Sequence, residues 1–201
     1  MSALNSATLI RGADLVAAPW KNGGGVTREV AAFPVGAGLD AFVWRVSVAD
    51  VAQPGPFSRF AGIDRTLVLL SGAGMLLDEA DGRTHALTRP LDIARFEGET
   101  SIDARLVDGA TRDFNLMVRR GAAIGEVAVL RDGASLQLSA DVVLLFCAEG
   151  SVDITLADRA NETLSANDTL RIDRAQSLPC AVKGAGALLA VSIRYTESNR
   201  A

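Results

Sequence analysis

The residues of this chain that are best suited to chemistry gather near its N-terminus. The segment Trp20–Gly25 reads WKNGGG, and a Thr-Arg-Glu triplet follows at positions 27–29. Consecutive glycines let backbone N–H groups converge on an anion, and arginine offers a planar fork that suits a carboxylate. The combination favours capture of a small organic anion. A tight turn or bulge that leads into a strand at Val26 is the alternative interpretation.

One charged residue interrupts an otherwise apolar stretch, Phe42–Val48. This residue is Arg45, and a buried charge needs an anionic or polar partner, which is either a ligand or an internal acid. The internal acids considered are Glu29, Asp64 and Asp113. Four basic side chains are candidates for binding a ligand carboxylate: Lys21, Arg28, Arg45 and Arg65.

Aromatic and small polar residues supply the rest of a candidate binding site. Trp20 and Phe57 are suited to walling a planar ligand, whereas Trp44 and Phe60 are more typical of core packing. Hydroxyl and amide side chains would orient the ligand by hydrogen bonds. The predicted ligand-binding residues are Trp20, Lys21, Asn22, Gly23, Gly24, Thr27, Arg28, Glu29, Arg45, Ser47, Phe57, Ser58, Arg65 and Asn115.

The single histidine, His85, limits the chemistry that we expect. One imidazole cannot build a metal site of several histidines, so neither a metal nor another cofactor is expected. A Ser-His-Asp triad with Ser47 or Ser58 lacks the Gly-x-Ser-x-Gly signature, so no catalytic residue is assigned. An acid/base pair of Glu29 with Asp64 or Asp113 stays open, because spacing in sequence does not give separation in space.

Composition restricts the class of protein further. The chain has 201 residues, of which 49% are hydrophobic, enough for one large or two small domains. A net charge of −4 without a basic cluster argues against nucleic acid as a partner. The apolar run Val142–Ala148 is far short of the ~20 residues that span a bilayer, and it predicts a buried thiol at Cys147. We expect a cytoplasmic protein with no membrane partner.

Short apolar runs separated by Gly, Asp, Asn and Pro predict an all-β fold, since long amphipathic helical patterns are absent. Two of the runs recur 75 residues later. Leu67–Leu70 matches Val142–Leu145, and Phe114–Arg119 matches Leu189–Arg194. A constant offset indicates duplication of one β-unit, which predicts two small sandwiches or barrels. Because the polar strands lie in the first half, we expect the pocket there.

Five segments carry a recognisable pattern: Pro19–Glu29, Trp44–Val51, Pro56–Gly74, Asp113–Met117 and Phe146–Gly150. Together they resemble the signature of the HutD/Ves family, and the resemblance covers nearly the whole chain. It implies an all-β, bicupin-like fold of two stacked double-stranded β-helix (jelly-roll) barrels that has lost the usual cupin metal ligands. Residues 1–120 would form the N-terminal barrel with the ligand site, and residues 121–201 the C-terminal barrel, packed as one compact body.

The resemblance also implies a function, because the family is associated with bacterial histidine utilisation. The expected role is a small-molecule-binding regulatory protein that captures a small carboxylate intermediate of the urocanate or formylglutamate type. The alternative is a metal-free cupin-like isomerase or hydrolase that acts on a related acid. The expected partner is a small anionic organic ligand. A homodimer is one expected assembly, because open sheet edges in such folds often pair.

Overall fold

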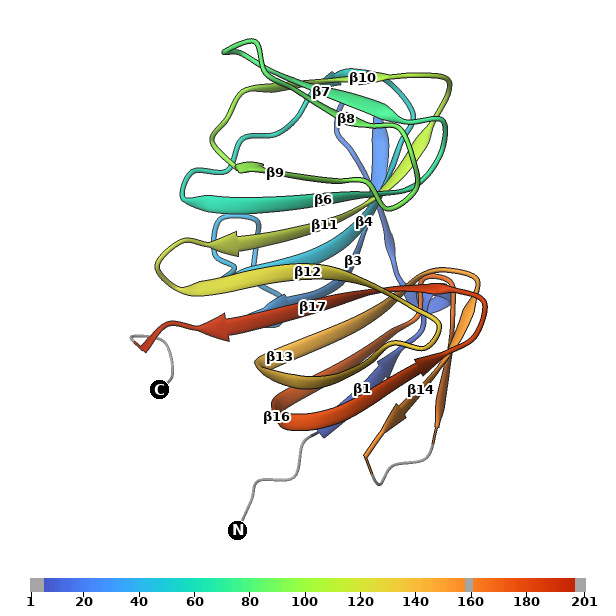
Figure 1. The fold of residues 1–201 in the computed structure, drawn as a ribbon. Coiled ribbons are helices and arrows are strands. Elements are labelled where there is room, and N and C mark those ends of the chain that lie inside the picture. The colour runs from blue at the N-terminus through green and yellow to red at the C-terminus, as the bar shows by residue number, and fades with distance from the viewer. Residues whose placement is uncertain (1–5, 158–160, 198–201) are drawn as a thin grey trace. The chain divides into compact units, whose positions relative to one another are not determined.

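The computed structural model describes residues 6–157 and 161–197, and these residues form β-strands and turns (Figure 1). The described residues contain no α-helix, only a short 3-10 turn at Gly12–Asp14, which confirms the all-β prediction. None of their helices has the length and apolar character needed to cross a membrane. The chain divides into two compact units: an N-terminal unit, Leu15–Ala123, and a C-terminal unit that combines the first 14 residues with Ile124–Ala201.

The N-terminal unit contains two antiparallel sheets. The larger sheet has the strand order β2-β3-β4-β11-β6-β9, and the smaller one has the order β5-β10-β7-β8. The strands of the larger sheet are β2 (Ala17–Pro19), β3 (Gly25–Phe33), β4 (Trp44–Val51), β6 (Ile63–Ser71), β9 (Ile93–Glu97) and β11 (Thr111–Arg119). Those of the smaller sheet are β5 (Gly55–Pro56), β7 (Met75–Glu79), β8 (Thr84–Leu87) and β10 (Ile102–Leu106).

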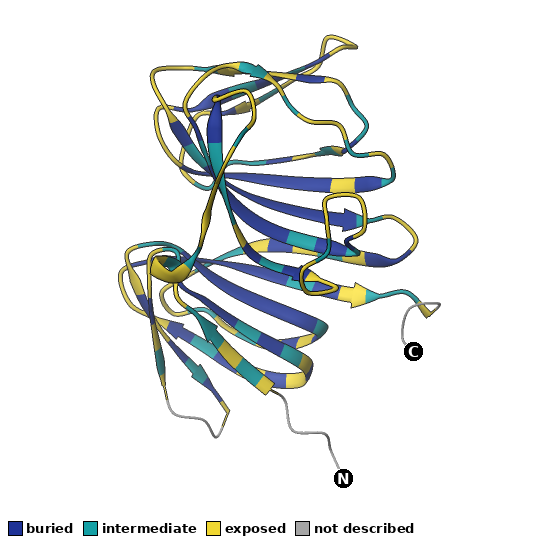
Figure 2. Cartoon of the chain, turned by 180° about the vertical axis from the view of Figure 1, so that it is seen from behind, coloured by how far each residue is buried: buried dark blue, intermediate teal, exposed yellow. Residues whose placement is uncertain are grey.

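The core of this unit comes from side chains of both sheets. Strand β7 alternates buried and partly exposed residues, as a strand with one covered face does, whereas β6 and β11 are buried along almost their whole length. Figure 2 shows this burial, with the exposed residues confined largely to turns and strand ends. The buried cluster consists of Ala49, Val51, Leu67, Leu69, Met75, Leu77, Leu87, Ala94, Ile102 and Ala104.

The C-terminal unit is built on one seven-stranded sheet. Six of its strands follow the order β12-β17-β13-β16-β14-β15, and the seventh, β1, pairs with β16. Its core includes both cysteine thiols, Cys147 and Cys180, which are free and buried, as predicted for Cys147. The strands are β1 (Ser6–Ile10), β12 (Ala123–Arg131), β13 (Ser135–Glu149), β14 (Ser151–Leu156), β15 (Glu162–Ser165), β16 (Thr169–Lys183) and β17 (Ala187–Tyr195).

The same pairing pattern occurs in both units, which supports the duplication. In the N-terminal unit β6 lies between β11 and β9, and β7 lies between β10 and β8. In the C-terminal unit β13 lies between β17 and β16, and β14 lies between β16 and β15. The long strand β16 therefore takes the place of both β9 and β10, because its first half pairs with β13 and its second half also pairs with β14.

The first strand does not follow the boundary expected from the sequence, which assigned residues 1–120 to one barrel. Strand β1 pairs with β16 in the register Ser6↔Asp173 to Ile10↔Thr169. Arg11 extends this contact through an ion pair of 2.7 Å with Asp168. Residues 6–14 therefore belong to the C-terminal unit. A short strand carries no local signal that says which sheet edge it will join.

Replacement of Trp44 measures how far the stability of the larger sheet depends on its buried aromatic residues. The indole is completely buried in the core, as the sequence suggested, and lies 6.5 Å from the ring of Phe33. We predict that Trp44→Ala lowers the free energy of unfolding by about 3–5 kcal/mol, because it leaves a large cavity. Val16→Ala is the control, since Val16 is 82% exposed and its truncation should change stability by less than about 0.5 kcal/mol. Urea unfolding measures both, and equal effects would contradict the prediction.

Candidate functional site

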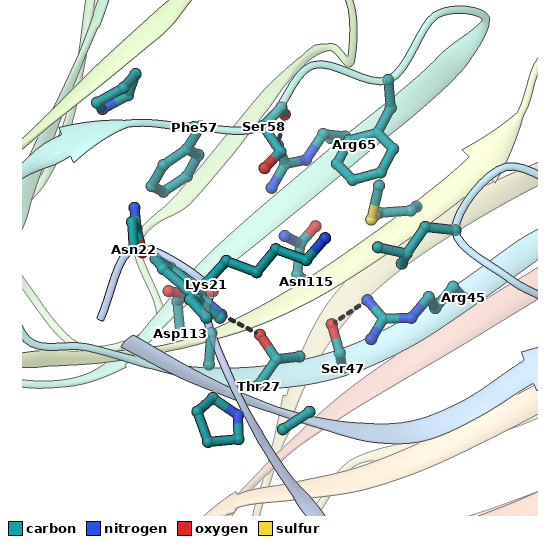
Figure 3. Close-up of a pocket in the computed structure, with 18 residues that line it drawn as sticks. Lys21, Asn22, Thr27, Arg45, Ser47, Phe57, Ser58, Arg65, Asp113 and Asn115 are labelled. Atoms are coloured by element: carbon teal, nitrogen blue, oxygen red, sulfur yellow. Dashed lines mark hydrogen bonds between the residues drawn. The ribbon is translucent and has the colours of Figure 1, made fainter. Parts of the chain in front are cut away.

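A cavity of about 550 Å³ opens on one face of the larger sheet of the N-terminal unit (Figure 3). Strands β3, β4, β11 and β6 form its floor, and the segments Pro19–Asn22 and Pro56–Phe60 form much of its wall. The residues that line it are Ala18, Pro19, Trp20, Lys21, Asn22, Thr27, Leu39, Arg45, Ser47, Ala49, Pro56, Phe57, Ser58, Phe60, Arg65, Asp113, Asn115 and Met117.

The strand register explains why residues so distant in sequence share this floor. Ser47 of β4 lies opposite Asn115 of β11, and Ala49 lies opposite both Thr27 and Asp113. Met117 lies opposite Arg45 on one side and Arg65 on the other. Because side chains of a strand alternate between faces, residues two apart on each strand point into the same cavity.

Arg65 is a buried cation that makes no direct ion pair among the described residues, although the charge of Asp113 acts on it. It is only 7% exposed, and its guanidinium carbon lies 5.0 Å from the ring centroid of Phe96 and 5.3 Å from that of Phe57. It donates one long hydrogen bond, 3.4 Å, to the carbonyl oxygen of Ser58, and its Nε has no partner. Within the described ranges it makes no ion pair. Burial lowers the pKa of Arg65 to about 10, so the side chain stays charged at neutral pH.

Arg45 differs from Arg65 because an internal acid already neutralises it. Its Nε donates to Glu29 Oε2 at 2.7 Å, and one terminal nitrogen donates to the hydroxyl of Ser47 at 3.2 Å. The Arg45 side chain is 13% exposed and that of Glu29 40%. Of the internal partners that the sequence left open, the structure selects Glu29, and Arg45 still lines the cavity.

Asp113 brings a carboxyl group to the same floor. It is 1% exposed, and its Oδ2 has no hydrogen-bond partner. Burial raises the pKa of Asp113 to about 7, against the attraction of the Arg65 cation, while the negative charge of Asp50 acts in the same direction as burial. Asn115, two residues along β11, is also buried and has an unpartnered Oδ1. The floor therefore offers one unpaired cation and two unpaired acceptors.

The glycine triplet forms a turn, as the alternative interpretation proposed. The N–H of Gly23 donates to the carbonyl of Trp20 at 3.0 Å, and that of Gly24 donates to Asn22 Oδ1, also at 3.0 Å. These donors are therefore satisfied within the turn and do not form an anion nest, and neither glycine lines the cavity. Gly25 must stay a glycine because a Cβ there would lie 2.5 Å from the Asp50 carbonyl oxygen. The turn holds Trp20, whose Nε1 donates to Thr27 Oγ1 at 2.7 Å.

The structure brings ten of the fourteen predicted site residues to the cavity: Trp20, Lys21, Asn22, Thr27, Arg45, Ser47, Phe57, Ser58, Arg65 and Asn115. Two of the other four are the turn glycines. Arg28 is excluded because it neighbours Thr27 on β3 and points to the opposite face, where it pairs with Asp50 at 2.6 Å. Glu29 is connected to the cavity only through Arg45.

Sequence reasoning missed other lining residues, of which Asp113 matters most. The sequence suggested Asp113 as an internal partner of arginine or as one member of an acid/base pair with Glu29, but not as a ligand-binding residue. Its position two residues before Asn115 on a predicted strand places both on one face. Phe60, Met117 and Leu39 also line the cavity. Apolar residues of these types give no local signal that separates a cavity wall from a packed core.

His85 lies outside the cavity lining. Its Nε2 is 2.6 Å from Oε1 of the buried Glu79, and its ring packs against Phe96. Arg83 also pairs with Glu79, at 2.7 Å. The ranges that the structure describes hold no cluster of three or more His, Cys, Asp or Glu residues suited to a metal ion.

The raised pKa of Asp113 predicts a pH-dependent stability difference. A group whose pKa is higher in the folded state contributes most stability below its unfolded value, 3.8, and loses that contribution as the pH rises through about 7. Asp113→Asn keeps the side chain neutral at every pH. Relative to the wild type, the free energy of unfolding of this variant should therefore increase between pH 4.5 and pH 8, by up to about 3 kcal/mol.

Urea unfolding at the two pH values measures this difference. Asp78→Asn is the control, because Arg105 lowers the pKa of Asp78 to about 2 and the wild-type carboxyl is therefore ionised throughout this range. An Asp113→Asn difference that does not vary with pH would contradict the prediction.

Comparison with known proteins places this chain in a family. The model of the HutD family matches residues 12–190. An uncharacterized 21.2 kDa protein in the hutC 3' region of Pseudomonas putida is 39% identical over 165 residues, which cover 82% of this chain and 86% of that protein. Protein Ves of Escherichia fergusonii is 37% identical over 111 residues, covering 55% of this chain and 56% of that protein.

Solved structures agree with the sequence matches. A conserved protein of unknown function from Pseudomonas aeruginosa PAO1 superimposes with a TM-score of 0.87 at 33% identity, covering 94% of this chain and 99% of that one. HutD from Pseudomonas fluorescens SBW25 gives 0.83 at 30% identity, covering 95% and 100%. Protein Ylba from E. coli, with a TM-score of 0.67 at 13% identity over 97% and 92%, shows likeness of fold alone. This chain belongs to the HutD family and has its cupin-like, all-β fold.

Proposed function

We propose that this protein binds a small organic carboxylate in the cavity of its N-terminal unit and thereby acts as a regulatory protein of histidine utilisation. The ligand class is that of urocanate and formylglutamate. The Arg65 guanidinium binds the carboxylate, and Phe57 and Trp20 pack against the body of the ligand. Capture of the intermediate, rather than its conversion, is the activity proposed.

The unpaired charge of Arg65 is the observation that carries this proposal. Removing a guanidinium from water costs free energy that an ion pair and hydrogen bonds normally offset. In the described part of the chain Arg65 makes no ion pair, its Nε has no hydrogen-bond partner, and its one hydrogen bond, to the Ser58 carbonyl, is long. Contacts with aromatic faces offset a part of the cost. A carboxylate is the complementary group, because it accepts two parallel hydrogen bonds from a guanidinium.

The size of the cavity and the family fit the proposal. A volume of about 550 Å³ lies within the range of small-molecule sites. Half of the lining residues are apolar and can pack against the body of a ligand, and the other half are polar or charged and can orient it. A relative lies in the hutC 3' region of P. putida, and a HutD structure from P. fluorescens is closely similar. These relations support an intermediate of histidine breakdown as the ligand.

Calorimetric titration with urocanate and with formylglutamate tests the proposal. We predict that the wild type binds at least one of them, and that Arg65→Met lowers the affinity by at least about 30-fold, because removing one partner of a desolvated ion pair costs about 2 kcal/mol or more. Met retains the apolar length that packs among the aromatic rings. The control is Arg105→Met, since Arg105 pairs with Asp78 outside the cavity. Failure of both acids to bind would overturn the proposal.

Arg45 should matter less than Arg65. Its charge is already balanced by Glu29, so a ligand carboxylate gains less from it. We predict that Arg45→Ala leaves the fold intact and weakens binding by about 3- to 10-fold, in keeping with a partly exposed ion pair. Titration and thermal unfolding of the same sample measure the two effects. A loss equal to that of Arg65→Met would contradict this ranking.

One observation favours the second candidate, a metal-free isomerase or hydrolase. Asp113 is a buried carboxyl in the cavity wall whose pKa is raised to about 7, a value suited to proton transfer at neutral pH. Glu29 and His85 are not available as its partner, because each is engaged elsewhere. Product analysis of the titrated mixtures separates the candidates: unchanged ligand supports capture, and a product that disappears with Asp113→Asn supports the enzyme.

A further inference from the structure

We infer that the cavity selects, among small carboxylates, those that also carry an N–H donor, and that Asp113 is the residue that recognises this donor. The inference rests on the proposed function and deepens it, because it adds a second recognition group at the end of the ligand opposite the carboxylate. Arg65 then fixes the class of ligand, and Asp113 fixes its specificity within that class.

Two unpaired acceptors are the first observation. Asp113 Oδ2 and Asn115 Oδ1 are buried and have no hydrogen-bond partner. In folded proteins about nine in ten buried polar groups are paired, so two unpartnered acceptors that line one cavity call for an explanation. Both residues line the cavity and lie beside one another on its floor in Figure 3. A ligand that donates a hydrogen bond would satisfy them.

The order of side chains along β11 is the second observation. Met117 lies between the two arginines, Asn115 follows two residues away, and Asp113 follows two residues beyond that. The floor therefore changes from a cationic end to an acceptor end along one strand. A carboxylate ligand without an N–H donor would pair only with the cationic end of the floor. It would leave the buried acceptors of Asp113 and Asn115 unpaired.

Internal groups do not satisfy Asp113 instead. Lys21 lines the cavity but makes no ion pair with Asp113 among the described residues. The Thr27 hydroxyl accepts the indole N–H of Trp20, and within the described ranges it donates no hydrogen bond to Asp113 Oδ2. The Arg65 cation acts on Asp113 through its charge, without a hydrogen bond. The terminal torsion of an aspartate turns over a broad range, so an oxygen of Asp113 can rotate toward a donor without leaving its rotamer.

Asp113 is the stronger acceptor of the two. A carboxylate accepts a charge-assisted hydrogen bond, about twice as strong as one to a neutral amide oxygen such as that of Asn115. With a pKa of about 7, Asp113 ionises at little cost at neutral pH when a donor arrives. A neutral Asn115 beside it accepts or donates according to the orientation of its amide.

A matched pair of ligands tests the inference. Urocanate carries an imidazole N–H, and 3-(3-furyl)acrylate has nearly the same shape and the same carboxylate without that donor. We expect the wild type to bind urocanate about 10- to 100-fold more tightly, the factor that a hydrogen bond to a charged group gives. Asp113→Leu should bring the ratio of the two dissociation constants close to one, by weakening urocanate alone.

Other variants separate recognition of the donor from a general loss of the site. Arg65→Met should weaken both ligands by a similar factor and keep their ratio. Asp78→Asn makes a similar change outside the cavity and should alter neither dissociation constant. Asp113→Asn is the smaller change, because it keeps an uncharged acceptor. It should lower the ratio of the two dissociation constants at least threefold, and it replaces Asp113→Leu in the test if that variant does not fold.

The outcomes distinguish this inference from the proposed function. Equal binding of the two acids by the wild type, or an unchanged ratio in Asp113→Leu and Asp113→Asn, would overturn the inference and leave carboxylate capture standing. Failure of the wild type to bind either acid would overturn the proposed function itself. A ratio that depends on Asp113 and not on Arg65 would support both.

Discussion

The Arg65 guanidinium, held out of water without an ion-pair partner among the described residues, is the constraint on which the rest of the site depends. Its carbon lies within 6 Å of three ring centroids, those of Phe57, Phe60 and Phe96. Cation–π contacts of this kind offset a part of the desolvation cost but leave the hydrogen-bonding capacity of the fork nearly unused. A protein that keeps a charge in this state retains the capacity to bind an anion at that point.

The antiparallel register of four strands turns this single charge into a site. Because β4 and β6 both pair with β11, the two arginines lie on either side of Met117, and Asn115 and Asp113 follow on the same face. Each arginine has a different environment, since Glu29 neutralises Arg45 while Arg65 stays unpaired. The same face therefore carries two cations: Arg45, which is paired with an acid of the protein, and Arg65, which can pair with a ligand.

The glycine segment acts on the site indirectly. Its N–H groups close the turn, and the tight approach of Gly25 to the Asp50 carbonyl brings Trp20 against Thr27 at the cavity rim. Lys21 and Asn22 follow Trp20 into the wall for the same reason. A side chain on Gly25 would push the segment off the sheet, so the glycine is needed for close approach of two backbones rather than for anion binding.

The sequence by itself determined the class of fold and most of the cavity wall. Strand-length apolar runs, recurring at a constant offset, predicted an all-β chain of two similar units, because the period-two pattern of a strand is a local property. The chemistry of the wall followed from residue types, since Arg45 stands in an apolar strand and Phe57 and Ser58 stand in a turn-rich segment.

The tertiary structure alone decided which residues face one another. Arg28 and Glu29 are neighbours in sequence, yet one pairs with Asp50 on the far face and the other with Arg45, because alternation and the bulge after Glu29 fix the faces. Asp113 became a site residue only through pairing of β11 with β4 and β6, and β1 joined the second unit through contacts with a strand more than 150 residues away. Such pairings depend on long-range register, which no local pattern encodes.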